Sequence, residues 1–247
     1  MRGELLLLSN SVVHGGRYLE HARGEIAEVL GDRRRLLFFP FASSDHDGYA
    51  RVMQDALDPL GIRVEGVHQV QDVAAAVRDA EAIFVGGGNS FRLLRTLRDL
   101  DLLAVMRAQV ERGAPYLGAS AGSNVACPTI RTTNDMPIVE VGSLDALGLI
   151  PFQINPHYLD PRPDSTHMGE TREQRLLQFL EENDVPVLGL REGSWLRVAH
   201  GRAVLGGKAG ARLFRRGQEP SEHVGGADFS WLLGTDPRFD AQGIPSG

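Results

Sequence analysis

The sequence predicts an α/β protein with a mostly parallel sheet flanked by helices. Short apolar runs alternate with longer amphipathic runs, which is typical of successive βαβ units. The first run, at 5–9, is apolar through Leu8, as buried parallel strands tend to be. Towards the C-terminus, short runs separated by glycine turns replace this alternation. That change predicts β-hairpins closing the domain.

Apolar runs and helical periodicity place the individual elements. Strands are expected at 5–9, 36–40, 63–67, 82–86, 115–118 and 152–155. Apolar residues at helical spacing predict helices at 18–30, 49–60, 73–80, 90–100, 102–112 and 121–126. Thr171 is a candidate N-cap for a further helix at 172–182. After Cys127 the period disappears, so 128–142 is expected to be an irregular loop.

The C-terminal quarter of the chain has a different pattern. Short strands are expected at 187–190, 195–199, 203–205 and 212–214, with turns at 200–201 and 206–207. From Gln218 onward the chain is rich in Gly, Pro and Asp and has no clear period. We therefore expect one hydrolytic domain at 1–217 and a C-terminal extension at 218–247.

Composition excludes several classes of partner. The 247 residues carry a formal net charge of −6, and basic residues are scattered, so nucleic-acid binding is not expected. No stretch approaches the roughly 20 apolar residues of a membrane span. Cys127 is the only cysteine, which excludes an intrachain disulfide and a cysteine-based zinc site. We expect a cytoplasmic protein.

The segment Gly118-Ala119-Ser120-Ala121-Gly122 is the sharpest local signal. It is a G-x-S-x-G motif between a predicted strand and a predicted helix, the context of a nucleophile elbow. There Ser120 would be a nucleophile, and the N–H of Ala121 could donate to an oxyanion. The alternative is a glycine-rich turn whose Ser120 only caps the helix. The pentapeptide alone does not decide between them.

A nucleophilic serine needs a base, and His157 is the best placed of the eight histidines. It directly follows a predicted strand, and the carboxyl ends of parallel strands share the edge where the elbow lies. His167 lies in a polar loop. The other histidines are expected in loops or on surfaces without a catalytic role: His14, His21, His46, His68, His200 and His223.

Two carboxylates are candidates for the residue that orients the histidine. Glu192 follows the predicted strand 187–190, and Asp135 lies in a polar loop shortly after the elbow helix. The pattern does not choose between them. A second strand-to-helix turn, Gly86-Gly87-Gly88-Asn89, lacks phosphate-loop and dinucleotide spacing. Its backbone N–H groups could form half of an oxyanion hole, or it could be only a tight turn. Cys127 is expected to be a small buried apolar residue.

Several longer motifs resemble the peptidase E family of α-aspartyl dipeptidases, peptidase family S51. In chain order they are LLLLSNS at 5–11, VGGGN at 85–89, SAG at 120–122, ACPTIRTTNDMPIV at 126–139, QINPH at 153–157 and GETREQR at 169–175. Two features depart from the usual family pattern. Ser90 stands where relatives tend to have Thr, and the tail after Gln218 is longer than that pattern. The length of the tail leaves a monomer and a homodimer open, with the tail as a candidate contributor to self-association.

The resemblance implies a fold like the class I glutamine amidotransferase domain, with serine in place of cysteine at the elbow. It also implies hydrolysis of dipeptides that begin with aspartate, without metal or cofactor. Ser120 and His157 would be nucleophile and base, and Gly88 and Ala121 would supply the oxyanion N–H groups. Glu192 is similar to the acid of the family's Ser-His-Glu triad, whereas Asp135 matches a residue implicated by sequence comparison.

The same resemblance suggests how aspartate is selected. A bidentate arginine suits a carboxylate best, and Arg172, at a predicted helix start, is the leading candidate. Arg131 is the second candidate, and Asn89 is a candidate for orienting the peptide. Two other functions stay open at this stage. One is a related cyanophycinase-like exopeptidase acting on β-aspartyl or other acidic peptides, and the other is a non-catalytic ligand-binding relative.

Overall fold

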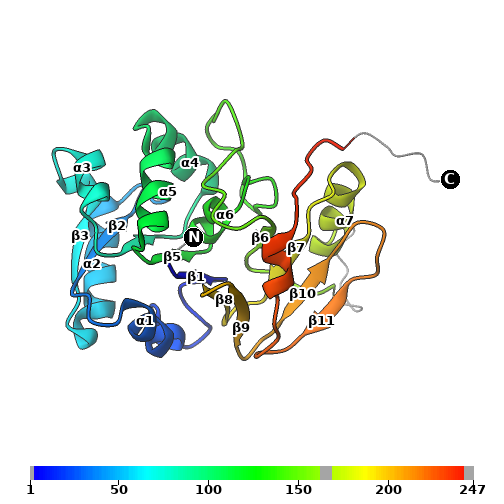
Figure 1. Cartoon of the computed structure of the whole chain (residues 1–247), viewed down its shortest axis with the longest axis horizontal. Coiled ribbons are helices and arrows are strands. Elements are labelled where there is room, and N and C mark those ends of the chain that lie inside the picture. The colour runs from blue at the N-terminus through cyan, green and yellow to red at the C-terminus, as the bar shows by residue number, and fades with distance from the viewer. Residues whose placement is uncertain (1–2, 162–168, 242–247) are drawn as a thin grey trace.

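A computed structural model describes residues 3–161 and 169–241 of the chain. His167 therefore lies outside the described residues. The chain forms a seven-stranded sheet of order β3-β2-β4-β5-β1-β8-β9 and a four-stranded sheet of order β11-β10-β7-β6. In Figure 1 the second sheet and α7 lie to the right of the first sheet.

The first sheet is parallel over five strands and antiparallel at one edge. Its parallel strands are β1 (Leu5–Leu8), β2 (Arg35–Phe39), β3 (Arg63–Gly66), β4 (Ile83–Val85) and β5 (Tyr116–Ala119). The hairpin β8 (Ser194–Ala199) and β9 (Arg202–Gly207) joins the open side of β1 in antiparallel register. The predicted mostly parallel α/β sheet is confirmed.

The second sheet mixes both directions. It contains β6 (Gln153–Asn155), β7 (Val187–Leu190), β10 (Ala211–Phe214) and β11 (Ser221–His223). β6 and β7 are parallel, while β10 is antiparallel to both β7 and β11. The predicted C-terminal β-hairpins are confirmed as β8–β9 and β10–β11. They belong to different sheets, because the consecutive strands β7 and β8 separate between the two sheets. The apolar strand β1 takes β8 as its neighbour, so β10 pairs with β7 instead.

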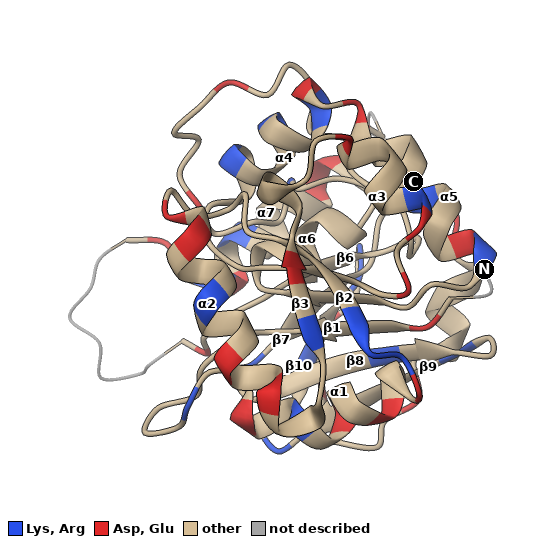
Figure 2. Cartoon of the chain, turned by 90° about the vertical axis from the view of Figure 1, so that its left-hand side faces the viewer, with Lys and Arg blue, Asp and Glu red and all other residues tan. Residues whose placement is uncertain are grey.

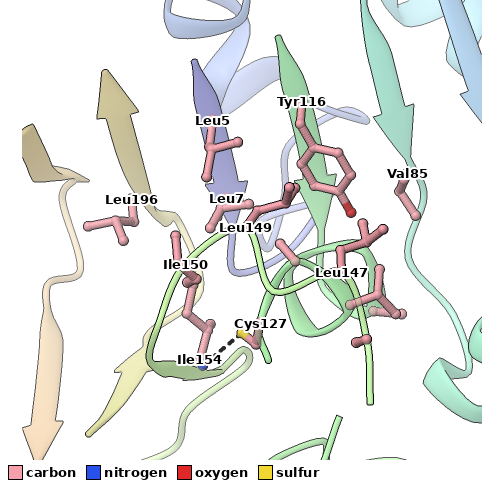
Figure 3. Packing of buried hydrophobic residues seen from close by; sticks show 14 of the residues in the cluster. Leu5, Leu7, Val85, Tyr116, Cys127, Leu147, Leu149, Ile150, Ile154 and Leu196 are labelled. Atoms are coloured by element: carbon pink, nitrogen blue, oxygen red, sulfur yellow. Dashed lines mark hydrogen bonds between the residues drawn. The ribbon is translucent and has the colours of Figure 1, made fainter. Parts of the chain in front are cut away.

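Helices cover both faces of the first sheet. Packed on one face are α3 (Val73–Arg78), α4 (Ser90–Asp99), α5 (Leu102–Arg112) and α6 (Ala121–Ala126), and on the other α1 (Arg23–Leu30) and α2 (His46–Leu57). The alternation of β1 explains this: Leu5 and Leu7 belong to one apolar cluster, and Leu6 and Leu8 to the other. Figure 3 shows part of the first cluster, where Leu5 and Leu7 lie near Tyr116.

Helix α7 (Arg172–Glu182) lies against the second sheet, where Leu176 and Leu180 pack on Val187 and Phe214. Thr171 and the side chain of Gln174 form a capping box at its start. The predicted bounds of α5, α6 and α7 are those observed. The first helix begins later than expected, since Leu19 has a left-handed φ of 56° and a short 3-10 turn, Glu20–Ala22, precedes α1.

Most of the predicted C-terminal extension has ordered contacts in the described part of the chain. Strand β11 pairs with β10, and the 3-10 turn Ser230–Gly234 buries Leu232 in the large apolar cluster. Three further 3-10 turns occur in the described residues. Two of them, Glu20–Ala22 and Asp58–Leu60, lie within the predicted helices 18–30 and 49–60. The third, Val67–Gln69, lies outside every predicted helix. On the side that Figure 2 shows, acidic and basic residues lie interspersed.

Candidate active site

Ser120 lies in a sharp turn between β5 and α6, at the carboxyl edge of the parallel strands. Its φ of 52° and ψ of −107° are unusual for a residue with a side chain. Glycine is needed on both sides of this turn because other backbone atoms lie where a side chain would begin. A Cβ at Gly118 would lie 2.6 Å from the carbonyl oxygen of Gly122, and one at Gly122 would lie 2.1 Å from that of Val85. The two glycines therefore let the turn pack tightly between neighbouring strands.

The Ser120 hydroxyl does not cap the helix that follows it. Only its backbone carbonyl takes part there, accepting from the N–H of Ser123 at 2.8 Å and of Asn124 at 3.0 Å. The hydroxyl oxygen instead lies 2.9 Å from Nε2 of His157. The geometry therefore does not support the alternative that Ser120 only caps the helix.

His157 follows β6 and is held in an uncommon backbone conformation, with φ of 52°. Its N–H donates to the Ser9 hydroxyl at 2.9 Å, and that hydroxyl donates to the Leu190 carbonyl at 2.8 Å. The next residue, Tyr158, donates its N–H to the same carbonyl at 2.9 Å. The ends of β1, β6 and β7 are thereby tied together, and this fixes where the imidazole points.

Glu192 lies in the turn between β7 and β8, on the far side of the imidazole from Ser120. Its Oε1 is 2.7 Å from Nδ1 of His157. The following residue, Gly193, donates its N–H at 2.8 Å to the side-chain oxygen of the buried Asn10. The His157 and Glu192 side chains are 40% and 49% exposed, so this pair is open to solvent.

Asp135 makes different contacts. Its Oδ2 accepts from both the N–H and the hydroxyl of Ser90 at 2.7 Å, and from the Thr133 hydroxyl at 3.2 Å. Since Ser90 is the first residue of α4, this carboxylate lies at a helix N-terminus, where a negative charge is favoured. The structure therefore places Glu192 beside the imidazole of His157, and Asp135 against α4.

The glycine turn after β4 runs beside the serine. A Cβ at Gly87 would lie 3.2 Å from the Cβ of Ser120, and Gly88 has a φ of 134°. The N–H of Gly87 donates to the Tyr49 hydroxyl at 2.8 Å. By contrast, the N–H groups of Gly88 and Ala121 have no hydrogen-bond partner among the described residues. Two unpartnered N–H groups near a serine hydroxyl are suited to binding a developing oxyanion.

Arg172 begins α7 and lines a small cavity of about 60 Å³. The cavity is otherwise lined by residues of the polar loop, β6 and α7, namely Arg131, Thr132, Thr133, Asn134, Asn155, Arg175, Leu176 and Phe179. Burial lowers the pKa of the Arg172 guanidinium, Arg175 adds to that effect, and Asp135 opposes it. A partly desolvated cation beside another cation favours an incoming carboxylate.

The other two candidate substrate contacts are occupied by the chain itself. Arg131 forms a two-point ion pair with Asp240, at 2.6 and 2.9 Å. The Asn89 side chain caps α4 by accepting from the N–H of Arg92 at 3.0 Å, and it donates to the Met136 carbonyl at 2.9 Å. Their side chains therefore serve first to fix the loops around the site.

The sequence patterns assign no role in the site to Ser9, Asn10 or Tyr49, and they mark Ser90 only as a departure from the family pattern. Ser9, Asn10 and Ser90 are buried polar residues, and each follows a strand or opens a helix at the same edge of the sheet. A polar pair directly after the apolar run of β1 was the available signal for Ser9 and Asn10. Tyr49 gave no comparable signal, because its position in α2 reads as apolar packing.

Neither a metal centre nor a membrane-spanning helix is found in the described parts of the chain. Within 3–161 and 169–241, no three His, Cys, Asp or Glu residues are grouped so as to hold a metal ion. In the same ranges, no helix is long and apolar enough to cross a bilayer. Cys127 is buried, and burial raises the pKa of its thiol to about 12. Its sulfur accepts from the N–H of Ile154 at 3.2 Å (Figure 3).

Comparison with known proteins gives a consistent set of relatives. The model of the family described as peptidase family S51 matches residues 5–206. A peptidase E from Streptomyces coelicolor is 59% identical over 236 residues, which cover 96% of this chain and 97% of that protein. A probable alpha-aspartyl dipeptidase from Drosophila melanogaster is 50% identical over 232 residues, covering 93% of this chain and 97% of that protein.

A solved structure shares the fold. The crystal structure of a peptidase from an acI-B1 Actinobacterium superposes with a TM-score of 0.69 at 18% identity. The match covers 92% of this chain and 96% of that one. The arrangement of sheets and helices described above is thus found in a protein of quite different sequence.

Proposed function

This chain belongs to peptidase family S51, and from that membership we propose that it hydrolyses dipeptides with an N-terminal aspartate through an acyl-enzyme intermediate. The observation that carries the proposal is the continuous hydrogen-bonded chain from Ser120 through His157 to Glu192, with distances of 2.9 and 2.7 Å. Such a chain is what a serine hydroxyl needs in order to become a nucleophile at neutral pH.

In the acylation step, the Ser120 Oγ attacks the scissile carbonyl carbon while Nε2 of His157 takes the hydroxyl proton. Glu192 accepts the Nδ1–H bond, which keeps Nε2 unprotonated in the resting enzyme and stabilises the imidazolium that forms. His157 then gives the proton to the leaving amine, and the C–N bond breaks. Water, deprotonated by the same nitrogen, hydrolyses the resulting ester and restores Ser120.

The oxyanion that forms in both steps would be bound by the N–H groups of Gly88 and Ala121. Gly88 needs its positive φ to present the N–H here, and an added Cβ would lie 2.4 Å from the Ala42 carbonyl oxygen. Ala121 is the first residue of α6, so its N–H also lies at the positive end of a helix. Donors fixed in advance lower the barrier because they need no reorganisation.

We assign selection of aspartate to Arg172. Its guanidinium lines the small cavity described above, and a two-point hydrogen bond to a carboxylate fits both the charge and the shape. The cavity is small, which favours the short aspartate side chain over glutamate. Because Arg131 is paired with Asp240, it serves in this proposal to hold the cavity wall.

The purified enzyme should therefore be assayed with Asp-Leu, Glu-Leu and Ala-Leu. We expect Asp-Leu to be cleaved with the highest kcat/KM, Ser120→Ala to abolish cleavage, and a fluorophosphonate probe to label Ser120. Equal rates on the three dipeptides would remove the assignment of specificity. Full activity of Ser120→Ala would refute the acyl-enzyme mechanism.

We also propose that the enzyme acts in the cytoplasm, as a monomer or a homodimer, and that 218–247 is an extension of the hydrolytic domain at 1–217. Sedimentation of the full chain and of a chain ending at 217 would test the last two points. The shortened chain lacks β11 and the buried Leu232, so a fall in its Tm is expected. A change in its mass from dimer to monomer would assign self-association to the extension.

A further inference from the structure

A second, larger cavity adjoins the serine turn and shares only Gly88 with the site proposed above. Its volume is about 630 Å³, and its walls come from the loop after β2, the start of α2 and the glycine turn after β4. The lining residues include Gly87, Gly88, Tyr49, Asp45 and Arg92. Because a Cβ added at Gly87 would lie only 3.2 Å from the Cβ of Ser120, this cavity opens beside the reacting atoms.

The proposed substrate supplies a reason for a second binding site. A dipeptide that begins with aspartate has one carboxylate on the acyl side of the scissile bond and another at the C-terminus, on the leaving residue. A partly buried carboxylate needs a compensating charge or hydrogen bonds. Arg172 can bind only the first of these carboxylates, so an enzyme that selects dipeptides has use for another cation.

Most arginines around the sheet edge are already paired with acids. Those with a carboxylate partner within 4 Å are Arg95, Arg131, Arg175 and Arg191, with Asp99, Asp240, Glu170 and Asp160 respectively. Arg92 differs from them. Its backbone N–H is bound by the Asn89 cap, and its half-buried side chain has neither an ion pair nor a hydrogen bond within 3–161 and 169–241.

One acidic side chain lines the same cavity and must be weighed against Arg92. The Asp45 carboxylate is the N-cap of α2, where it accepts from the N–H of Gly48 at 2.8 Å. The positive end of α2 therefore compensates much of its charge. Asp45 is exposed, so solvent also screens it. Arg92, on α4, is the charge in this cavity without a compensating partner.

We propose that this cavity, hereafter the Arg92 cavity, is the subsite for the leaving residue of the substrate, and that the Arg92 guanidinium binds its C-terminal carboxylate. The inference rests on the proposed function. It explains how the site would distinguish a dipeptide from a longer peptide, since a longer peptide has an uncharged amide in place of that carboxylate.

The test compares two substrates that differ only in this charge, Asp-Leu and its C-terminal amide. We expect Arg92→Gln to lower kcat/KM for Asp-Leu by roughly 10- to 100-fold, the effect of losing one hydrogen-bonded charge pair, and to leave the amide unaffected. Arg92→Lys should recover part of the loss. Arg95→Gln, one turn along the same helix and outside the Arg92 cavity, is the matched control and should change neither substrate.

Equal losses on the two substrates, or no loss on either, would overturn the Arg92 assignment while leaving the dipeptidase proposal standing. A wild-type enzyme that cleaves the amide as fast as Asp-Leu would do the same. Failure of the wild-type enzyme to cleave Asp-Leu at all would instead overturn the proposed function, and the subsite with it. The Tm of each variant, compared with wild type, separates loss of folding from loss of binding.

Discussion

Replacing Glu192 and Asp135 separately tests which carboxylate supports the histidine. Glu192 accepts from Nδ1 of His157 at 2.7 Å, whereas Asp135 accepts from Ser90 at the start of α4. The two changes should therefore affect different quantities. Loss of Glu192 is expected to lower kcat, and loss of the Asp135 charge is expected to lower stability.

The size of the effect follows from the contact. A hydrogen bond to a charged group contributes about 1.5–3 kcal/mol. At about 1.36 kcal/mol per tenfold change in rate, Glu192→Ala should lower kcat about 10- to 150-fold. The lower end is favoured, because His157 and Glu192 are 40% and 49% exposed and water can replace the lost oxygen. Glu192→Gln should lose more, since an amide can donate to Nδ1 and hold the wrong tautomer, an error that costs about 10⁴-fold in serine proteases.

For Asp135→Asn we expect kcat on Asp-Leu to stay near the wild-type value and the free energy of unfolding to fall by about 0.3–1 kcal/mol, the worth of a charge at a helix N-terminus. Steady-state kinetics and urea unfolding of the three variants measure both quantities. The assignment fails if Asp135→Asn loses as much kcat as Glu192→Ala while folding normally. A Glu192→Gln variant with full kcat would also refute the assignment of Glu192 as the residue that supports His157.

Three further changes test the supports of the site. Tyr49→Phe leaves the N–H of Gly87 without its 2.8 Å acceptor, so we expect kcat to fall roughly tenfold with KM unchanged, as measured by steady-state kinetics. Gly122→Ala puts a methyl group 2.1 Å from the Val85 carbonyl oxygen, and the resulting overpacking should lower the free energy of unfolding by at least about 1–3 kcal/mol in urea titrations. Burial raises the pKa of the Cys127 thiol from 9.0 to about 12, so above pH 9 the unfolded chain loses a proton that the folded chain keeps. Stability should then fall by about 1.4 kcal/mol per pH unit up to pH 12, and this slope should be shallower by that amount in Cys127→Ala. Equal slopes would show that the thiol ionises alike in both states.

Much of the fold could be predicted because it depends on local patterns. The apolar run of β1 and the capping signal at Thr171 each lie within a few residues of the element they specify. The division into two sheets could not be predicted in this way. Strands β7 and β8 look like successive arms of a hairpin, and only the pairing of β8 with β1, far away in sequence, separates them.

The same distinction applies to the site. The residue types and their places at strand ends were enough to predict Ser120 and His157 and to narrow the acid to two candidates. The contacts that distinguish those acids join distant segments, such as the bond between Gly193 and Asn10, 183 residues apart. The pairing of Arg131 with Asp240 spans 109 residues and lies in a tail whose composition gave no sign of it. No local pattern contains such information.

The backbone of the two central residues shows how this site is kept in position. Ser120 and His157 both have a φ of 52°, a conformation that is unfavourable for residues with side chains and persists only where the surroundings impose it. At Ser120 the imposition comes from β1, whose Leu8 carbonyl accepts the serine N–H at 3.0 Å. At His157 the constraint comes from Ser9, which follows Leu8 and whose hydroxyl accepts the His157 N–H. One segment, Leu8-Ser9, therefore binds the backbone N–H groups of both reacting residues, whose side chains meet at 2.9 Å.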